Sequence, residues 1–112
     1  MIGGGIVVRG TTQGYLLNIK KYDLSKSTVY VTIDQHGHKI TKNNSDLQIM
    51  ANEDGTKILF TLSQEDTLFF DSGVAYIQVR FINKNGRALA TKKKKIDVYP
   101  VLQKGVIQYG AE

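Results

Sequence analysis

Apolar and polar side chains alternate with a period of two along much of this chain, a pattern typical of β-strands and incompatible with amphipathic helices. Alternation is clearest over residues 15–20, 28–35, 57–62 and 74–83, and a weaker segment covers 46–51. In an extended strand this period puts the apolar side chains on one face, as a half-buried sheet requires. The sequence therefore predicts a chain built mostly of strands.

Three glycines that follow a polar residue separate these segments and predict hairpins. Glycine accepts the positive φ angles of tight two-residue turns at little steric cost. The pairs are His36-Gly37, Asp54-Gly55 and Asn85-Gly86, joining 28–35 to 38–43, 46–51 to 57–62, and 74–83 to 87–98. Pro100 follows the last alternating run, where it ends the strand because it lacks a backbone donor.

One segment between the strands breaks the alternation and is typical of a capped helical turn. Ser63 has the side chain of an N-cap residue, and Asp66 stands three positions later, before an apolar stretch. We expect one turn of helix that crosses from one layer of strands to another, with Leu68 or Phe69 closing the end of the core.

Several short strands and one crossover favour two packed layers over a parallel α/β sheet. The predicted fold is all-β, an immunoglobulin-like antiparallel β-sandwich with one short helical crossover turn. The length of 112 residues matches a single domain, 1–112. Residues 1–6 and 108–112 are predicted to be flexible.

No pattern of catalytic or cofactor-binding residues is present, so the chain is not expected to be an enzyme. Cysteine is absent, and no nucleophile elbow, phosphate loop or zinc-protease motif occurs. Asp34, His36 and His38 have a spacing that a metal ion can use on an extended strand. The turn predicted at His36-Gly37 would separate the three, and we expect no metal site and no cofactor.

The charge of the chain depends on one short segment. Its formal net charge is +5, and without the run Lys92, Lys93, Lys94 and Lys95 it would be +1. In one regular strand over 88–98, Lys92 and Lys94 would share a face with Ile96 and Val98, which would bury charge. We therefore expect a bulge here or a protruding edge strand. Three roles remain open: protecting an edge from unwanted pairing, docking to an acidic protein, and binding nucleic acid.

Two tyrosines are candidates for an interaction surface. Tyr30 and Tyr76 fall on the outward parity of strongly alternating segments. Tyrosine combines a large apolar ring with a polar tip and is enriched at protein interfaces.

Several short motifs, spread over nearly the whole chain, occur together in one known family. They are Val7-Val8-Arg9-Gly10-Thr11-Thr12, residues 60–70, Ile77-Gln78-Val79-Arg80 before Asn85-Gly86, Ala88-Leu89-Ala90, Ile96-Asp97-Val98 and Val101-Leu102 with Gly105-Val106-Ile107. In these motifs the chain resembles small structural proteins encoded by tailed bacteriophages and prophages of Gram-positive bacteria. The family pattern often has proline where this chain has Gln13, and a less basic strand where it has Lys92–Lys95.

This resemblance implies a virion structural protein of the tail or baseplate region, made in the bacterial cytoplasm, with no catalytic residues. Its expected partners are other virion subunits, with a homo-oligomer as a further possibility and no membrane. A host-surface or carbohydrate-binding β-sandwich module is an alternative, in which exposed tyrosines stack on sugar rings. A basic nucleic-acid-binding protein is a weaker alternative, which predicts salt-sensitive DNA binding.

Overall fold

The structure is a computed structural model that describes residues 5–110. Of the residues predicted to be flexible, 1–4 and 111–112 lie outside the described residues. Ile6 belongs to the first strand, whereas 108–110 lie in an irregular segment. The described residues form nine strands and two short helical turns: β1 (Ile6–Val8), β2 (Gln13–Lys20), β3 (Thr28–Gln35), β4 (His38–Lys42), η1 (Asn44–Asp46), β5 (Gln48–Asn52), β6 (Gly55–Leu62), α1 (Gln64–Phe69), β7 (Gly73–Ile82), β8 (Ala88–Ala90) and β9 (Lys94–Tyr99).

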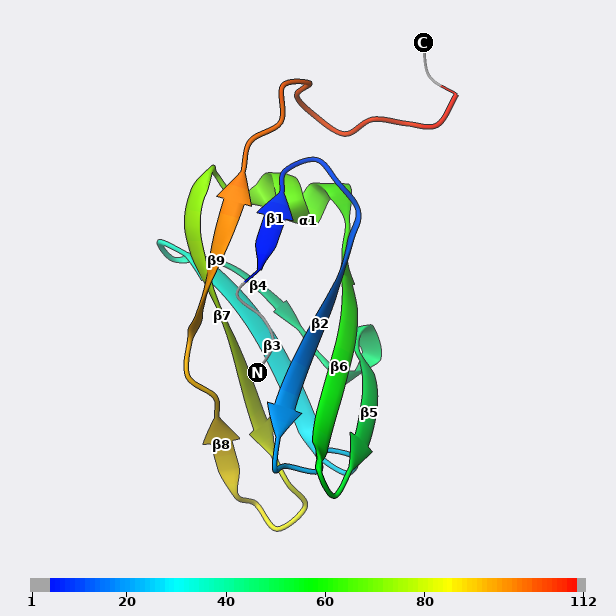
Figure 1. Cartoon of the computed structure of the whole chain (residues 1–112), viewed down its shortest axis with the longest axis vertical. Helices are drawn as coiled ribbons and strands as arrows, with labels where there is room; N and C mark the ends of the chain where they lie inside the picture. Colours follow the sequence, from blue (N-terminus) through cyan, green and yellow to red (C-terminus); the bar gives the residue numbers. More distant parts are fainter. Residues whose placement is uncertain (1–4, 111–112) are drawn as a thin grey trace.

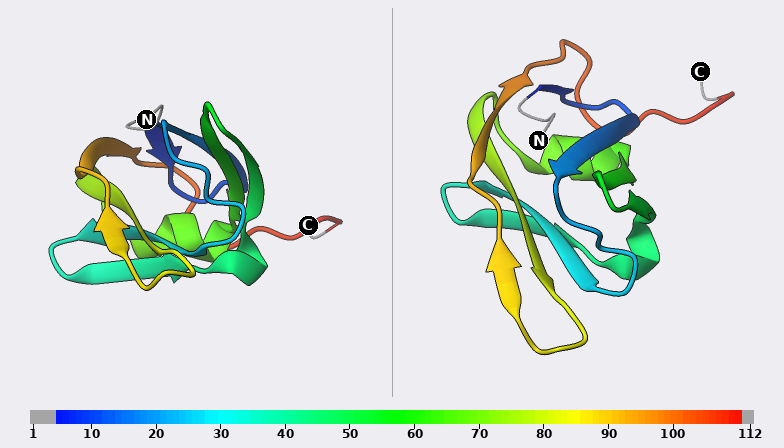
Figure 2. Two further views of the ribbon diagram at one scale, coloured as in Figure 1. Left: turned by 90° about the horizontal axis from the view of Figure 1, so that it is seen from below. Right: turned by 60° about the horizontal axis from the view of Figure 1, so that its bottom comes forward.

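The strands form two sheets that face each other (Figures 1 and 2). Sheet A has the order β1-β9-β7-β3-β4, with β8 paired to β7, and sheet B has the order β2-β6-β5. Sheet B matches strands B, E and D of an immunoglobulin domain, and β9-β7-β3-β4 matches the G-F-C-C′ sheet of a variable-type domain. The predicted immunoglobulin-like β-sandwich is therefore confirmed. One pairing departs from the antiparallel pattern, because β1 runs parallel to β9.

The core consists of the inward-facing side chains of both sheets, as the alternation predicts. Sheet B contributes Leu17 and Ile58, and sheet A contributes Ile33 and Ile77, all at most 2% exposed. Because the chain has no cysteine, packing between these layers replaces the disulfide that links the sheets of antibody domains.

The strands predicted to pair as hairpins do so, but the turns differ from one another. Asn85-Gly86 lies in a loop longer than the predicted two-residue turn. In this loop the Asn83 amide donates to the Arg87 carbonyl, and the Gly86 amide donates to the Asn83 carbonyl. His36 and Gly37 both have positive φ, 52° and 89°, as the tight turn between β3 and β4 requires. The turn before β6 consists of Glu53 and Asp54, and Gly55 already belongs to the strand. The weakest predicted strand, 46–51, lies two residues later as β5, because its start is taken up by the η1 turn.

The predicted crossover turn is confirmed as α1, which connects sheet B to sheet A across one end of the sandwich (Figure 1). Ser63 Oγ accepts a hydrogen bond from the Asp66 amide, and Asp66 accepts one from the Ser63 amide. The prediction that Leu68 or Phe69 closes the core was wrong. Phe70, the C-cap residue, is 1% exposed, whereas Phe69 is 47% exposed, because Phe70 extends away from the helix toward β7.

Residues 101–110 extend away from the sandwich beyond α1 (Figure 1). Gln64 holds this segment through two hydrogen bonds, donating to the Ile107 carbonyl and accepting from its amide. Among residues 5–110, no helix has the length and apolar character needed to cross a membrane.

Candidate interaction surface

The outer face of sheet A carries the residues that the sequence singled out. Tyr30 lies on β3 opposite Arg80 of β7, and Tyr76 lies on β7 between Asp34 and Lys95. Both rings are exposed, as their parity predicted. Arg80, which pairs with Tyr30, and Tyr76 are four positions apart on β7, so the two tyrosines are separated by about 13 Å along the strand direction. The two tyrosines thus belong to one face without touching.

Four further large apolar side chains share this face and were missed by the sequence reasoning. Together with Tyr30 and Tyr76 they are each 37–47% exposed: Ile6, Val74, Ile82 and Tyr99. We call these six residues the sheet A patch. Val74 and Ile82 could have been predicted from the sequence, because they have the same strand parity as Tyr76 and so face the same side of β7. Ile6 and Tyr99 required the β1–β9 pairing, which brings the start and end of the folded chain together.

A small hollow of about 210 Å³ adjoins Tyr30, and its lining is mostly apolar and includes Arg80, Phe81, Ile82 and Ala88. It arises where β8 pairs with β7, because Ala88 stands opposite Ile82 and is too small to fill the space above the sheet. A hollow beside an exposed aromatic ring is suited to receive a protruding side chain of a partner.

The lysine run does not continue a regular strand. β8 ends at Ala90 and β9 begins at Lys94, so Lys92 and Lys93 lie in the break. Ala88 and Ala90 are exposed and Leu89 packs against the core, so β8 has the opposite parity to Ile96 and Val98 in β9, as an interrupted strand requires. The break shifts the alternation by one position between β8 and β9. All four lysines are exposed, although Lys94 has the same parity as the buried Ile96.

Thr91 holds this break in a defined geometry. Its amide donates to the Val79 carbonyl at 2.8 Å, and its Oγ1 accepts from the Val79 amide at 3.0 Å. Gln78 donates from its side chain to the Thr91 carbonyl at 2.8 Å. The main-chain pairing of β7 is thereby preserved although its neighbour is interrupted. The predicted bulge is therefore an ordered interruption of the strand, held by these three hydrogen bonds.

Two of the lysines are connected to the outer face of sheet A. Lys93 Nζ lies 5.5 Å from the centre of the Tyr76 ring, within the range of a cation–π contact. Lys95 Nζ lies 3.8 Å from Asp97 Oδ1 in an exposed ion pair. The sequence places no aromatic residue inside the lysine run, but the neighbouring strand brings Tyr76 against it. The lysine run and the sheet A patch thus form one continuous surface.

The lysines were predicted to lie on a protruding edge strand, and among residues 5–110 Lys94 and Lys95 have an unpaired edge on one side of β9 only. Within the described residues, β1 pairs with Asp97, Val98 and Tyr99 of β9, so Lys94 and Lys95 precede that pairing. On its other side β9 pairs with β7 along Lys94 to Val98.

Asp34, His36 and His38 lie where the hairpin prediction put them, at the β3–β4 turn. Asp34 Oδ1 accepts from the Gly37 amide at 3.1 Å, which stabilises the turn. The His38 ring packs 5.6 Å from the ring of Phe69. Within residues 5–110, no three histidine or acidic side chains gather in a way that could hold a metal ion.

No family model and no curated protein sequence matches the chain. The solved structures that it resembles include AggA, the major subunit of aggregative adherence fimbriae type I from Escherichia coli, at 11% identity over 87% of this chain and 90% of AggA, with a TM-score of 0.42. Another is the V domain of amphioxus IgVJ-C2, at 16% identity over 85% of this chain and 98% of that domain, with a TM-score of 0.33. At these scores neither carries an argument about function, and the fold assignment rests on the strand order.

Proposed function

We propose that the protein is a structural component of a bacteriophage or prophage virion, in the tail or baseplate region, and that it assembles through protein–protein contacts. The observation that carries this proposal is the sheet A patch, with six large apolar side chains half-exposed on one face of a rigid sheet. Aromatic side chains at the centre of a patch with charged groups at its rim are typical of protein interfaces.

Charged side chains are interspersed among the apolar ones of the sheet A patch. Arg80 pairs with Tyr30 and lies between Tyr76 and Ile82 along β7. Lys95 stands beside Tyr76, and Lys93 lies over the ring of Tyr76. A partner surface with acidic side chains at matching positions would pair with these cations. Such charges act mainly on the rate and specificity of association, while the apolar side chains supply most of the affinity.

Strand edges offer a second mode of contact. Within the described residues, β4 is the last strand of sheet A, and β2 and β5 are the two outer strands of sheet B. A partner strand that pairs with an edge gains main-chain hydrogen bonds and a defined register. The resemblance to phage structural proteins supports other virion subunits as partners, in a particle assembled within the bacterial host.

Replacement of Tyr30 and Tyr76 by alanine in the phage genome tests this proposal. Wild-type protein is expected to co-purify with intact particles, detected by immunoblot, whereas the Tyr30→Ala, Tyr76→Ala double variant is expected to be reduced at least about tenfold in particles, as loss of two interface aromatics predicts. Leu16→Ala is the matched control, because Leu16 is a similarly exposed apolar residue on the outer face of sheet B.

Circular dichroism and thermal melting of each purified variant would show that the fold is retained. Absence of the wild-type protein from purified particles would refute the virion assignment. Equal incorporation of the double variant would refute the sheet A patch as the contact.

A further inference from the structure

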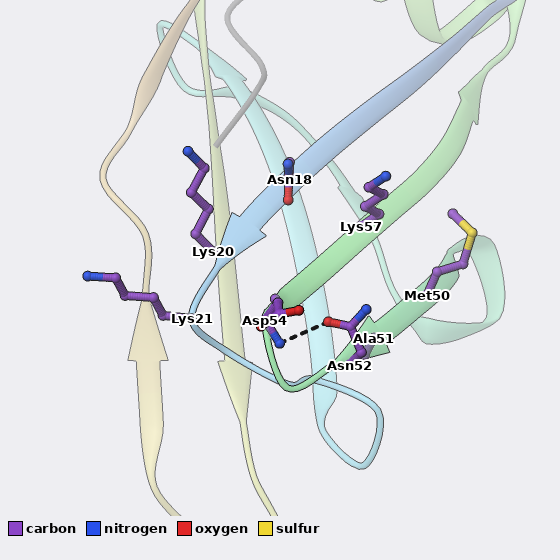
Figure 3. A pocket seen from close by; sticks show the side chains of 9 residues that line it. Asn18, Lys20, Lys21, Met50, Ala51, Asn52, Asp54 and Lys57 are labelled. Carbon is purple, nitrogen blue, oxygen red and sulfur yellow. Dashed lines mark hydrogen bonds between the residues drawn. The ribbon is translucent and has the colours of Figure 1, made fainter.

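A hollow lies on the outer face of sheet B, on the opposite side of the sandwich from the sheet A patch (Figure 3). Its volume is about 720 Å³, within the range of roughly 300–1,000 Å³ usual for small-molecule sites. The residues that line it are Asn18, Lys20, Lys21, Met50, Ala51, Asn52, Asp54, Gly55 and Lys57.

A glycine in the middle strand creates this hollow. Gly55 of β6 stands between Lys20 of β2 and Asn52 of β5, and all three positions have outward parity. A Cβ added to Gly55 would lie 2.6 Å from the Ile19 carbonyl oxygen, and its φ of 154° also disfavours other residues. Glycine is therefore required where β6 begins against β2, and the sheet carries no side chain between Lys20 and Asn52 at this position.

The adjacent row supplies a second wall. Lys57 of β6 lies between Asn18 of β2 and Met50 of β5. Figure 3 shows the side chains of Lys20 and Lys57 flanking that of Asn18 on the outward side of the strands. The hollow is thus bordered by two ammonium groups and an amide.

Positive charge dominates the hollow. Three lysines, Lys20, Lys21 and Lys57, line it together with one carboxylate, Asp54. The ion pairs found among residues 5–110 are Lys42–Asp66 and Lys95–Asp97, and neither involves these lysines. The lysines are exposed and repel one another, so an anion that enters the hollow relieves this repulsion.

The backbone of Lys21 indicates that its side chain has a role here. Lys21 has a φ of 71°, in the left-handed region that glycine and asparagine adopt at much lower cost. Its amide donates to the Asp54 carbonyl at 3.0 Å, which joins the end of β2 to the β5–β6 turn. A strained residue at the rim of a hollow is a pattern associated with binding sites.

The amides add hydrogen-bonding groups for neutral hydroxyls. Asn52 Oδ1 accepts from the Asp54 amide at 2.9 Å (dashed in Figure 3), which orients the amide group and directs its NH₂ group as the donor. Asn18 is half-buried at one end of the second row, and Met50 supplies an apolar surface at the other end, beyond Lys57. Ammonium, amide and apolar groups together match a polyhydroxylated ligand that carries one acidic group.

We propose that this hollow binds an anionic saccharide, a sugar unit with a phosphate or carboxylate group. The lysines hold the acidic group, the Asn18 and Asn52 amides bond hydroxyls, and Met50 packs against the apolar face of the ring. The lining contains no aromatic residue on which a base could stack, which disfavours single-stranded nucleic acid. The site goes beyond the assembly function and leaves the sheet A patch free.

Titration of the ¹⁵N-labelled full chain with glucose 6-phosphate, glucuronate and glucose, followed by NMR, tests this site. The two charged sugars are expected to shift amides of residues 18–21 and 50–57, and neutral glucose is expected to have at least about tenfold lower affinity, as loss of a charged hydrogen bond predicts. Glucose 6-phosphate and glucuronate separate the phosphate from the carboxylate source of the acidic group. Absence of shifts with both charged sugars would overturn the proposal.

Two variants and a control sharpen the test. The Lys20→Gln, Lys57→Gln double variant is expected to bind at least about tenfold more weakly. Lys21→Gly is expected to weaken binding while melting no lower than wild type, because glycine relieves the positive φ. Lys39→Gln, an exposed lysine on β4, should bind like wild type. Equal weakening by Lys39→Gln, or tighter binding of a short DNA strand than of either sugar, would overturn a specific saccharide site.

Discussion

One carboxylate oxygen of Asp66 connects the two sheets. Asp66 Oδ2 accepts from the Ser63 amide at 2.9 Å and from Lys42 Nζ at 2.9 Å. Ser63 follows the last strand residue of β6 in sheet B, whereas Lys42 ends β4 in sheet A. The helix cap that the sequence predicts therefore also contributes an ion pair between the layers. The sequence contained no signal for Lys42, because the two residues are 24 positions apart.

The environment of Asp66 lowers the pKa of its carboxyl group. Burial alone raises this pKa, but the hydrogen bond from the Ser63 amide and the contact with Lys42 outweigh burial. A lowered folded-state pKa means that the ionised carboxylate stabilises the fold above the unfolded-state pKa, about 3.9 for Asp. This contribution is lost as the pH falls through the lower folded-state value.

Substitution Asp66→Asn is expected to lower the free energy of unfolding by about 1 kcal/mol at pH 7, through the lost cap and ion pair. Below about pH 4 the stabilities of wild type and variant should converge, because wild-type Asp66 becomes protonated. Urea denaturation across this pH range, followed by circular dichroism, measures the difference. Glu65→Gln, at the exposed neighbouring position, should keep the wild-type profile, and a constant gap between wild type and Asp66→Asn would contradict the assignment.

At the level of elements, the interruption between β8 and β9 decides which side chains face the solvent. A regular strand would have turned Lys92 and Lys94 toward the core. The break at residues 91–93 shifts the phase between β8 and β9, so that Leu89 faces the core in β8 whereas Ile96 and Val98 do so in β9. Lys94 keeps the inward parity of Ile96, opposite Ile77, and is exposed because it stands at the start of β9. The hydrogen bonds between Thr91 and Val79 define where the phase shifts.

Substitution Thr91→Val keeps the shape of the side chain but removes the acceptor of the Val79 amide. An amide left without a partner at a partly buried site costs about 1–3 kcal/mol, so the variant should unfold at a lower urea concentration. Thr32→Val is the control, because the Thr32 hydroxyl pairs with that of Thr41 on the exposed face, and its effect should stay within about 0.5 kcal/mol. Equal stability of Thr91→Val and wild type would show that the hydroxyl is dispensable for the break.

For the molecule as a whole, closure of one end of the sandwich depends on the crossover. Phe70 is buried where the chain passes from α1 to β7, and Arg9 Nε donates to its carbonyl at 2.7 Å. Arg9 follows β1, so this contact ties the N-terminal strand to the crossover. The end of the core is thus closed by two segments that are 61 positions apart in the sequence.

Adjacent phenylalanines provide a matched test of this closure. Phe70→Ala is expected to lower the free energy of unfolding by about 3–5 kcal/mol, because it leaves a cavity in the core. Phe69→Ala removes the same atoms from a half-exposed position and should cost less than about 1.5 kcal/mol. Denaturation followed by circular dichroism suits this comparison, since the chain has no tryptophan. Similar losses for both variants would contradict the assignment of Phe70 as the core residue.

Local patterns in the sequence determined the strands, the tight turn at His36-Gly37, the Ser63 cap and the outward direction of Tyr30 and Tyr76. Each depends on residues a few positions apart, since strand parity, turn angles and capping are set by neighbouring backbone groups.

Only the tertiary structure decided the β1–β9 pairing, the phase shift at Thr91, the contact of Lys93 with Tyr76 and the hollow above Gly55. All of these join segments distant along the chain: Lys20 meets Gly55 across 35 positions. The spacing of residues within one segment does not determine which other strand will pair with it. That choice is made when the two sheets bury their apolar faces together, and this is why the candidate surfaces emerged only from the folded chain.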